Sequence, residues 1–187
     1  VSAKSSAKYI YETSKTSKTT KSYPNNPFAK QLKTAAEFIN SGLETKVYYV
    51  SMGGFDTHAS QPNRQSRLLK TYAEAIDIFV NDLEASNSFK DTLIVTFSEF
   101  GRRVQQNAAA GTDHGAASNL FIIGKQLKKP GFYNASPDLS NLDSNGDLKY
   151  SIDFRSIYAT LLEHWLDANH SNIPVSYTHL TLPTSLI

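Results

Sequence analysis

Apolar residues recur at steps of three and four in several stretches of this chain, which is the period of an amphipathic helix. The first stretch starts after Pro27 and stops at Ser41-Gly42, a pair typical of a helix C-terminus. The last stretch follows Asp153, whose side chain suits a helix N-cap. The pattern therefore predicts helices over residues 28–39, 67–83 and 154–166.

Short continuous apolar runs lie between these helices and predict strands over residues 47–52, 92–97 and 120–123. Runs without polar alternation are typical of strands that are covered on both faces, as in a parallel sheet. The order strand, helix, strand over residues 47–97 predicts a right-handed crossover, with ligands bound beyond the carboxyl ends of the strands. We therefore expect an α/β fold built on a mainly parallel sheet.

The two ends of the chain differ in composition from its middle. Residues 1–23 are rich in Ser, Thr and Lys, so we expect a linker or a solvated helix there. Residues 24–173 carry the predicted elements and form part of an α/β domain. Residues 174–187 include Val175–Thr184, which resembles the translation of a transposon-end sequencing adapter. We expect a non-native tail at this end and exclude His179 as a ligand.

The charge balance and the lack of cysteine narrow the chemistry. The chain has 19 Lys and Arg against 17 Asp and Glu, and this near balance argues against a nucleic-acid surface although the pI is about 8.7. No apolar run approaches the roughly 20 residues that a membrane-spanning helix needs. Without Cys, a metal must be held by His, Asp and Glu, which suits zinc, manganese, calcium or magnesium.

Metal-ligating side chains occur in three short motifs beside the predicted strands. Residues 53–58 (Gly-Gly-Phe-Asp-Thr-His) follow the first strand, and their glycines allow a sharp turn. Residues 98–102 (Ser-Glu-Phe-Gly-Arg) follow the second strand, and residues 111–115 (Gly-Thr-Asp-His-Gly) precede the third. We expect these side chains to converge at one edge of the sheet. The candidate metal ligands are Asp56, His58, Glu99, Asp113 and His114, and Arg102 is the candidate catalytic residue.

Each motif also has a structural interpretation. Asp56 could cap a helix beside a surface histidine. Glu99 could form an ion pair with Arg102, and Asp113 could be a turn residue. Taken together, two histidines and three carboxylates beside strand ends in a Cys-free chain favour a site.

Zinc is the metal that we expect first. Asp56, His58 and His114 would satisfy three positions and leave one open for water or substrate, as a catalytic zinc requires.

Calcium at residues 143–147 is the weaker alternative. Asp143, Asn145 and Asp147 alternate as in an EF-hand loop, but Gly146 precedes the third ligand and no Glu follows at the required place. The same residues predict a hairpin turn.

The motifs resemble those of the domain-of-unknown-function family 1501. The family motifs read Gly-Gly-Trp-Asp-Thr-His, Ser-Glu-Phe-Gly-Arg, Asp-His and Asp-Phe-Arg. In this chain Phe55 replaces the Trp, and Asp153-Phe154-Arg155 completes the set in the same order. The resemblance covers about residues 24–168.

That family is grouped with the alkaline phosphatase and sulfatase superfamily, so the resemblance implies a three-layer αβα fold and one or two divalent metals. It implies that Asp56, His58 and His114 belong to the first metal site. It places Glu99 where the superfamily has an Asp of a second site. The superfamily has a His after that Asp, whereas this chain has Phe100, which leaves a second site incomplete.

The implied function is hydrolysis of a small phosphate or sulfate ester by an extracytoplasmic enzyme. The resemblance places the nucleophile and a signal peptide upstream of this sequence, so we expect the fragment alone to be inactive. Arg102 would bind the anion oxygens, whereas Arg155 is expected to pair with a nearby carboxylate. The alternative is a binding or scaffold protein that keeps the fold and a metal, which Glu99-Phe100 favours. A serine hydrolase is not supported, because no Gly-x-Ser-x-Gly motif occurs.

Overall fold

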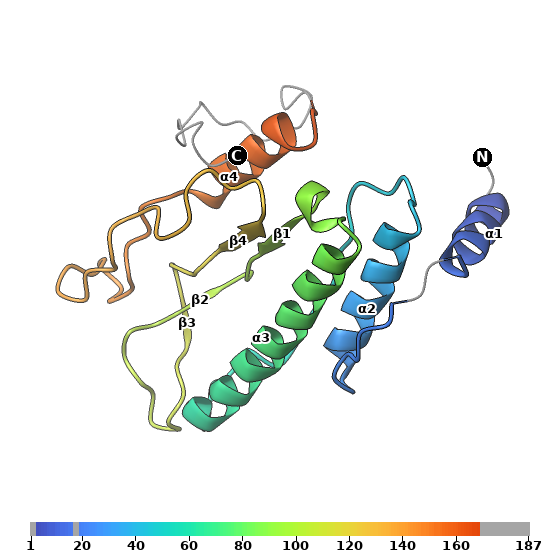
Figure 1. Cartoon of the computed structure of the whole chain (residues 1–187). Helices are drawn as coiled ribbons and strands as arrows, with labels where there is room; N and C mark the ends of the chain where they lie inside the picture. The colour runs from blue at the N-terminus through green and yellow to red at the C-terminus, as the bar shows by residue number, and fades with distance from the viewer. Residues whose placement is uncertain (1–2, 17–18, 169–187) are drawn as a thin grey trace. The chain divides into compact units, whose positions relative to one another are not determined.

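The structure is a computed structural model that describes residues 3–16 and 19–168 (Figure 1). The chain divides into two compact units, residues 1–92 with 109–111 and residues 93–108 with 112–187. The expected tail with His179 lies outside the described residues. The elements in order are α1 (Ala3–Ser14), α2 (Pro27–Asn40), α3 (Gln61–Ala85), the 3-10 helix η1 (Phe89–Asp91), β1 (Leu93–Thr96), β2 (Gly101–Arg102), β3 (His114–Gly115), β4 (Phe121–Gly124) and α4 (Phe154–His164).

The first predicted helix, α2, is confirmed together with the signals at its two ends. The side chain of Asn26, the N-cap, accepts a hydrogen bond from the Ala29 N–H at 2.8 Å. Pro27 lies in the first turn, where a missing N–H costs no helical hydrogen bond. The helix closes at Ser41, and Gly42 follows with a φ of +75°, in the left-handed region that favours glycine.

Helices α2 and α3 pack against each other and form the apolar core of the first unit (Figure 1). Helix α3 starts at Gln61, earlier than predicted, because its first turns carry polar residues that show no apolar stripe. Phe28 and Tyr72 stack across the pair with ring centroids 6.0 Å apart. The buried apolar side chains are Phe28, Ala29, Leu32, Ala35 and Ala36 of α2, Ala75, Ile76, Phe79 and Leu83 of α3, and Phe89 of η1.

Residues 47–52, predicted as a buried strand, are not in a strand. Val47 and Tyr49 are 65% and 79% exposed, whereas the Tyr48 ring stacks on Phe38 of α2 at 6.5 Å. The strands of the described chain all belong to the second unit, so this segment has no strand beside it within its own unit. The prediction was wrong because an apolar run becomes a strand only where another strand pairs with its backbone.

The second unit contains two antiparallel ladders, β1 with β4 and β2 with β3. The strands predicted over residues 92–97 and 120–123 are confirmed, but the parallel pairing expected for them was wrong. Parallel neighbours need a crossover, usually a helix, that returns the chain to the same end of the sheet. Residues 97–120 contain no helix, and Leu93 therefore lies opposite Gly124 in an antiparallel register.

The fold is thus a mixture of helices and small antiparallel sheets. Within the described residues, no helix has both the length and the apolar character that crossing a membrane requires.

The predicted hairpin turn is present, since Leu142 and Leu148 form an antiparallel bridge around it. The Asp143 carboxylate accepts hydrogen bonds from the N–H groups of Asp147 and Asn145, at 2.9 and 2.8 Å. These two bonds, that from Asp147 first, hold the pKa of Asp143 below its usual value. The alternation of these polar residues is therefore accounted for by turn chemistry.

The last predicted helix, α4, is confirmed, although it ends at His164, two residues before the predicted end. Asp153 caps it by accepting a hydrogen bond from the Arg155 N–H at 2.9 Å. The Arg155 side chain donates to the same carboxylate through Nε at 2.8 Å, which confirms the expected pairing. The side-chain bond first, and then the backbone bond, lower the pKa of Asp153 to about 2.

Candidate metal centre

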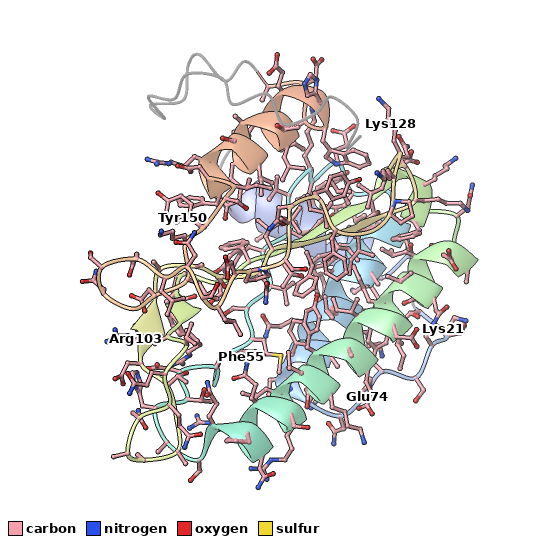
Figure 2. The ribbon with its side chains drawn as sticks, turned by 90° about the vertical axis from the view of Figure 1, so that its left-hand side faces the viewer. Lys21, Phe55, Glu74, Arg103, Lys128 and Tyr150 are labelled. Carbon is pink, nitrogen blue, oxygen red and sulfur yellow. The ribbon has the colours of Figure 1, made fainter. Side chains whose placement is uncertain are left out.

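The loop that leads into α3 carries two of the candidate ligands. Asp56 and His58 are two residues apart and lie on the same side of the loop, with Asp56 Oδ1 2.9 Å from His58 Nε2. Their side chains are 58% and 46% exposed. Phe55, labelled in Figure 2, directly precedes this pair. The loop therefore presents a carboxylate oxygen and an imidazole nitrogen to solvent.

Thr57, which stands between these two ligands, is fully buried. Its hydroxyl accepts a hydrogen bond from Gln61 Nε2 at 2.9 Å and lies 3.3 Å from the Phe55 carbonyl oxygen. Gln65 of α3 is 3.4 Å from the same hydroxyl. The Thr57 N–H also donates to the Phe55 carbonyl at 2.9 Å, so the buried Thr57 fixes a tight turn from which both candidate ligands are exposed. Sequence reasoning missed this residue, although its position between two candidate ligands is a usable signal.

Residues 109–111 lie against this loop and belong to the same unit. The Ser60 N–H donates to the Ala109 carbonyl at 3.0 Å, and the Gln61 N–H donates to the Ala110 carbonyl at 2.9 Å. These carbonyls accept hydrogen bonds from N–H groups at the N-terminus of α3, where the Ser60 side chain makes no cap hydrogen bond. Gly111 is buried, and a Cβ atom on it would lie 2.2 Å from the His58 carbonyl carbon. Such a close backbone approach requires glycine.

In the second unit, a short ribbon of β2 and β3 presents His114. Each strand is two residues long, and Arg102 lies opposite His114. The His114 imidazole stacks on the Phe100 ring, with centroids 4.0 Å apart and planes at 6°. Arg102 Nη1 donates to the Thr112 carbonyl at 2.6 Å, and its guanidinium carbon lies 4.9 Å from the centre of the Phe100 ring. Phe100 therefore contacts two of the candidate site residues, and sequence reasoning missed this role.

Close backbone approaches and one charged side chain hold the ribbon within its unit. A Cβ atom on Gly101 would lie 1.7 Å from the Ala117 carbonyl oxygen, so β2 lies directly against the chain that follows β3. Arg103, labelled in Figure 2, donates through Nε to Asp147 at 3.2 Å and through Nη2 to the Asn145 carbonyl. The residues after β2 are thereby fixed to the hairpin.

The remaining candidate ligands, Glu99 and Asp113, also belong to the second unit and are exposed. Glu99 lies in the turn after β1, where the Ser98 hydroxyl donates to the Phe100 carbonyl at 2.9 Å. The Asp113 carbonyl accepts from the Arg103 N–H at 3.0 Å, and its carboxylate lies 3.4 Å from Asn107 Nδ2. Asp113 thus makes contacts typical of a turn residue.

Asp56, His58 and His114 together offer one carboxylate oxygen and two imidazole nitrogens, all on exposed side chains. A ligand set of this composition suits zinc, and manganese or magnesium accept it less readily because they prefer more oxygen ligands.

Comparison with known proteins identifies a family. A family model described as Protein of unknown function (DUF1501) matches residues 3–178. No curated protein matches, and no solved structure matches. The matched span includes every candidate ligand and all the helices and strands described above.

Proposed function

We propose that this chain, which belongs to the family described as Protein of unknown function (DUF1501), binds a divalent metal ion through Asp56, His58 and His114. Zinc is the first metal proposed, with manganese, calcium and magnesium as alternatives. In the whole protein the ion would take part in the hydrolysis of a small phosphate or sulfate ester. The observation that carries the proposal is the contact between residues 109–111 and the loop of Asp56 and His58.

Asp56 and His58 are spaced almost as two ligands of one ion. With bonds of roughly 2.0–2.2 Å and tetrahedral angles, neighbouring ligand atoms lie roughly 3.3 Å apart. Asp56 Oδ1 and His58 Nε2 are 2.9 Å apart, so the pair needs to open by only roughly 0.4 Å. Because both side chains are about half exposed, a bound ion would keep a position open to water or substrate.

Chain connectivity keeps His114 near this pair. Gly111 lies against the His58 backbone, and His114 is the third residue after Gly111. Three residues span at most roughly 11 Å even when fully extended. His114 is therefore confined to the neighbourhood of His58 by the length of the connection alone.

The proposal also assigns roles to three other residues, Arg102, Glu99 and Asp113. A guanidinium carries five N–H donors, and the Thr112 carbonyl takes one of those of Arg102. Arg102 is proposed to bind the oxygens of the ester through its planar fork. Glu99 and Asp113 are proposed as further oxygen ligands, since both are exposed and close in sequence to the ribbon that carries His114.

The reaction class rests on the resemblance to the alkaline phosphatase and sulfatase superfamily, which also supports a three-layer αβα fold and an extracytoplasmic location for the whole protein. A bound divalent ion would neutralise the anionic ester and activate the nucleophile. In this chain Asp56, His58 and His114 would hold the ion, and Arg102 would orient the ester. The resemblance places the nucleophile outside this sequence.

Metal content of the full chain tests the site. After incubation with zinc and desalting, we expect about one equivalent in the wild type by plasma mass spectrometry. Asp56→Ala, His58→Ala and His114→Ala should each weaken binding by at least about 100-fold, because losing a ligand costs more than losing a partner of a ligand. Asp77→Ala and His164→Ala replace exposed residues of α3 and α4 and should keep the metal. Unchanged metal in the three ligand variants, or none in the wild type, contradicts the proposal.

Turnover separates the hydrolase from a second function, metal binding without catalysis. Phe100 favours this second function, because its ring packs on His114 where the superfamily has a further ligand. The assay uses p-nitrophenyl phosphate and p-nitrophenyl sulfate with the protein extended upstream of residue 1. Hydrolysis that is lost on zinc removal and in Arg102→Met supports the enzyme. Stoichiometric zinc without turnover supports the binding protein instead.

A further inference from the structure

Phe100 covers one face of the His114 imidazole. At a centroid separation of 4.0 Å and an interplanar angle of 6°, the two rings are nearly parallel and overlap over much of their area. The nitrogens of an imidazole lie at the edge of the ring. Stacking on the face therefore restrains the ring without covering the atoms that bind a metal.

The backbone of the ribbon does not by itself determine where the His114 ring points. Strand β3 is two residues long, and a ladder fixes the backbone but not the two side-chain torsions of a histidine on it. A flat aromatic surface against one face excludes the rotations that tilt the ring. Phe100 thus selects among the orientations that the backbone allows.

Phe100 is itself held in place. The Ser98 hydroxyl donates to the Phe100 carbonyl at 2.9 Å, which closes the turn before β2. The Arg102 guanidinium lies 4.9 Å from the ring centre, and Arg102 is paired with His114 across the ribbon. Arg102 and His114 are cross-strand partners and the Phe100 ring contacts both side chains, so the three lie together at one side of the ribbon.

We infer that Phe100 is a positioning residue of the metal site, which holds the His114 imidazole in the orientation that reaches the ion. This inference rests on the proposed function, because it requires that His114 bind a metal. A ligand that is already oriented loses less side-chain freedom on binding, so the ion binds more tightly. Phe100 would act through His114 and would not touch the metal or the ester.

Proton NMR of the metal-free chain tests the stack directly. The His114 imidazole resonances are assigned by their absence in His114→Ala. In the wild type they should lie upfield of those of a solvent-exposed histidine, because a ring stacked on an aromatic face is shielded. Phe100→Leu should move them to ordinary positions, and Phe100→Tyr should keep them upfield. Phe97→Leu is the matched control, since Phe97 packs edge-on against Tyr158 at 5.8 Å and should leave the His114 resonances unchanged.

Zinc titration of the same variants tests the consequence for binding. Phe100→Leu should bind zinc roughly three- to tenfold more weakly, whereas Phe100→Tyr and Phe97→Leu should bind as the wild type does. A purely structural role would lower the melting temperature of Phe100→Leu without weakening zinc binding by the folded protein.

The possible outcomes separate the inference from the proposed function. Equal zinc affinity of the wild type and Phe100→Leu overturns the positioning role and leaves the metal site intact. A wild type that binds no zinc overturns the proposed function, and the positioning role falls with it. If Phe100→Leu does not fold, the wild-type spectrum still decides, because unshielded His114 resonances overturn the stack.

Discussion

The two histidine-bearing segments hold their imidazoles by different means. The loop with His58 is anchored by hydrogen bonds, because buried Thr57 contacts the first turns of the 25-residue helix α3. The backbone of Gly111 also lies directly against that of His58. The ribbon with His114 has strands of only two residues, and an aromatic ring stacks on one face of the exposed histidine.

Because of this difference, we expect substitutions in the two segments to change the free energy of unfolding and the metal affinity to different extents. Damage to the His58 loop removes buried polar contacts at the start of a long helix, so it should lower the free energy of unfolding together with metal affinity. Damage to the Phe100 stack removes a contact between a half-buried ring and the exposed His114 ring, so it should mainly change the metal affinity. Three substitutions at the two segments test this contrast, and a fourth at the cap of α4 follows them, from the largest expected effect to the smallest.

Gly111→Ala should destabilise the protein most. The new Cβ atom would lie 2.2 Å from the His58 carbonyl carbon, and two backbone segments would have to separate. Gly111 has no positive φ, so the effect is steric, and we expect a loss of about 3 kcal/mol in urea unfolding. Gly53→Ala is the control, because nothing lies within 4 Å of its Cβ position and its effect should stay within about 0.5 kcal/mol. Equal stability of the two variants would show that residues 109–111 do not lie against His58.

Thr57→Val should cost about 2 kcal/mol of unfolding free energy. The substitution keeps the shape of the side chain but removes, at a fully buried position, the hydroxyl that accepts the 2.9 Å bond from Gln61 and lies 3.3 Å from the Phe55 carbonyl. Thr57→Ser retains the hydroxyl and should recover most of the loss. Zinc affinity should fall together with stability, which distinguishes this residue from Phe100. A valine variant as stable as the wild type would contradict the anchoring of the loop by this hydroxyl.

Arg102→Met should cost about 1 kcal/mol, because the 2.6 Å bond to the Thr112 carbonyl is lost at a half-buried position. Arg67→Met, on the exposed surface of α3, is the control and should change stability by less than about 0.5 kcal/mol. Stability is measured by urea unfolding, as for the other variants. If the two variants are equally stable, Arg102 does not hold the loop before His114.

Asp153→Asn should have the smallest effect, and it should depend on pH. Arg155 lowers the pKa of Asp153 to about 2 in the folded chain, so the charged carboxylate stabilises the fold above the unfolded pKa of roughly 4. That contribution is lost as the pH falls from roughly 4 to about 2. Asparagine still caps the helix but does not titrate, so helicity by circular dichroism should fall less between pH 4 and pH 2 than in the wild type. Parallel acid profiles of the two proteins would contradict this assignment.

Local patterns in the sequence predicted the elements whose stability comes from nearby residues. The apolar stripe of α2, its Pro27 and Gly42 ends, the Asp153 cap and the Leu142–Leu148 hairpin all depend on residues a few positions apart. The apolar runs at β1 and β4 were also correctly recognised as strands. Residues 47–52 show the limit of this reasoning, because the same kind of apolar run has no strand beside it in its own unit.

The sequence alone determined both ends of α2 and the start of α4, the existence of two of the three predicted strands, and the residue types that can bind a divalent metal. The tertiary structure decided that β1 and β4 run antiparallel, that Thr57 is buried between two exposed candidate ligands, and that Phe100 lies flat on His114. Local signals depend on spacing along one segment, which a sequence displays directly. Strand direction, close backbone approach and ring stacking depend on segments that meet only after the chain folds, and no single segment encodes them.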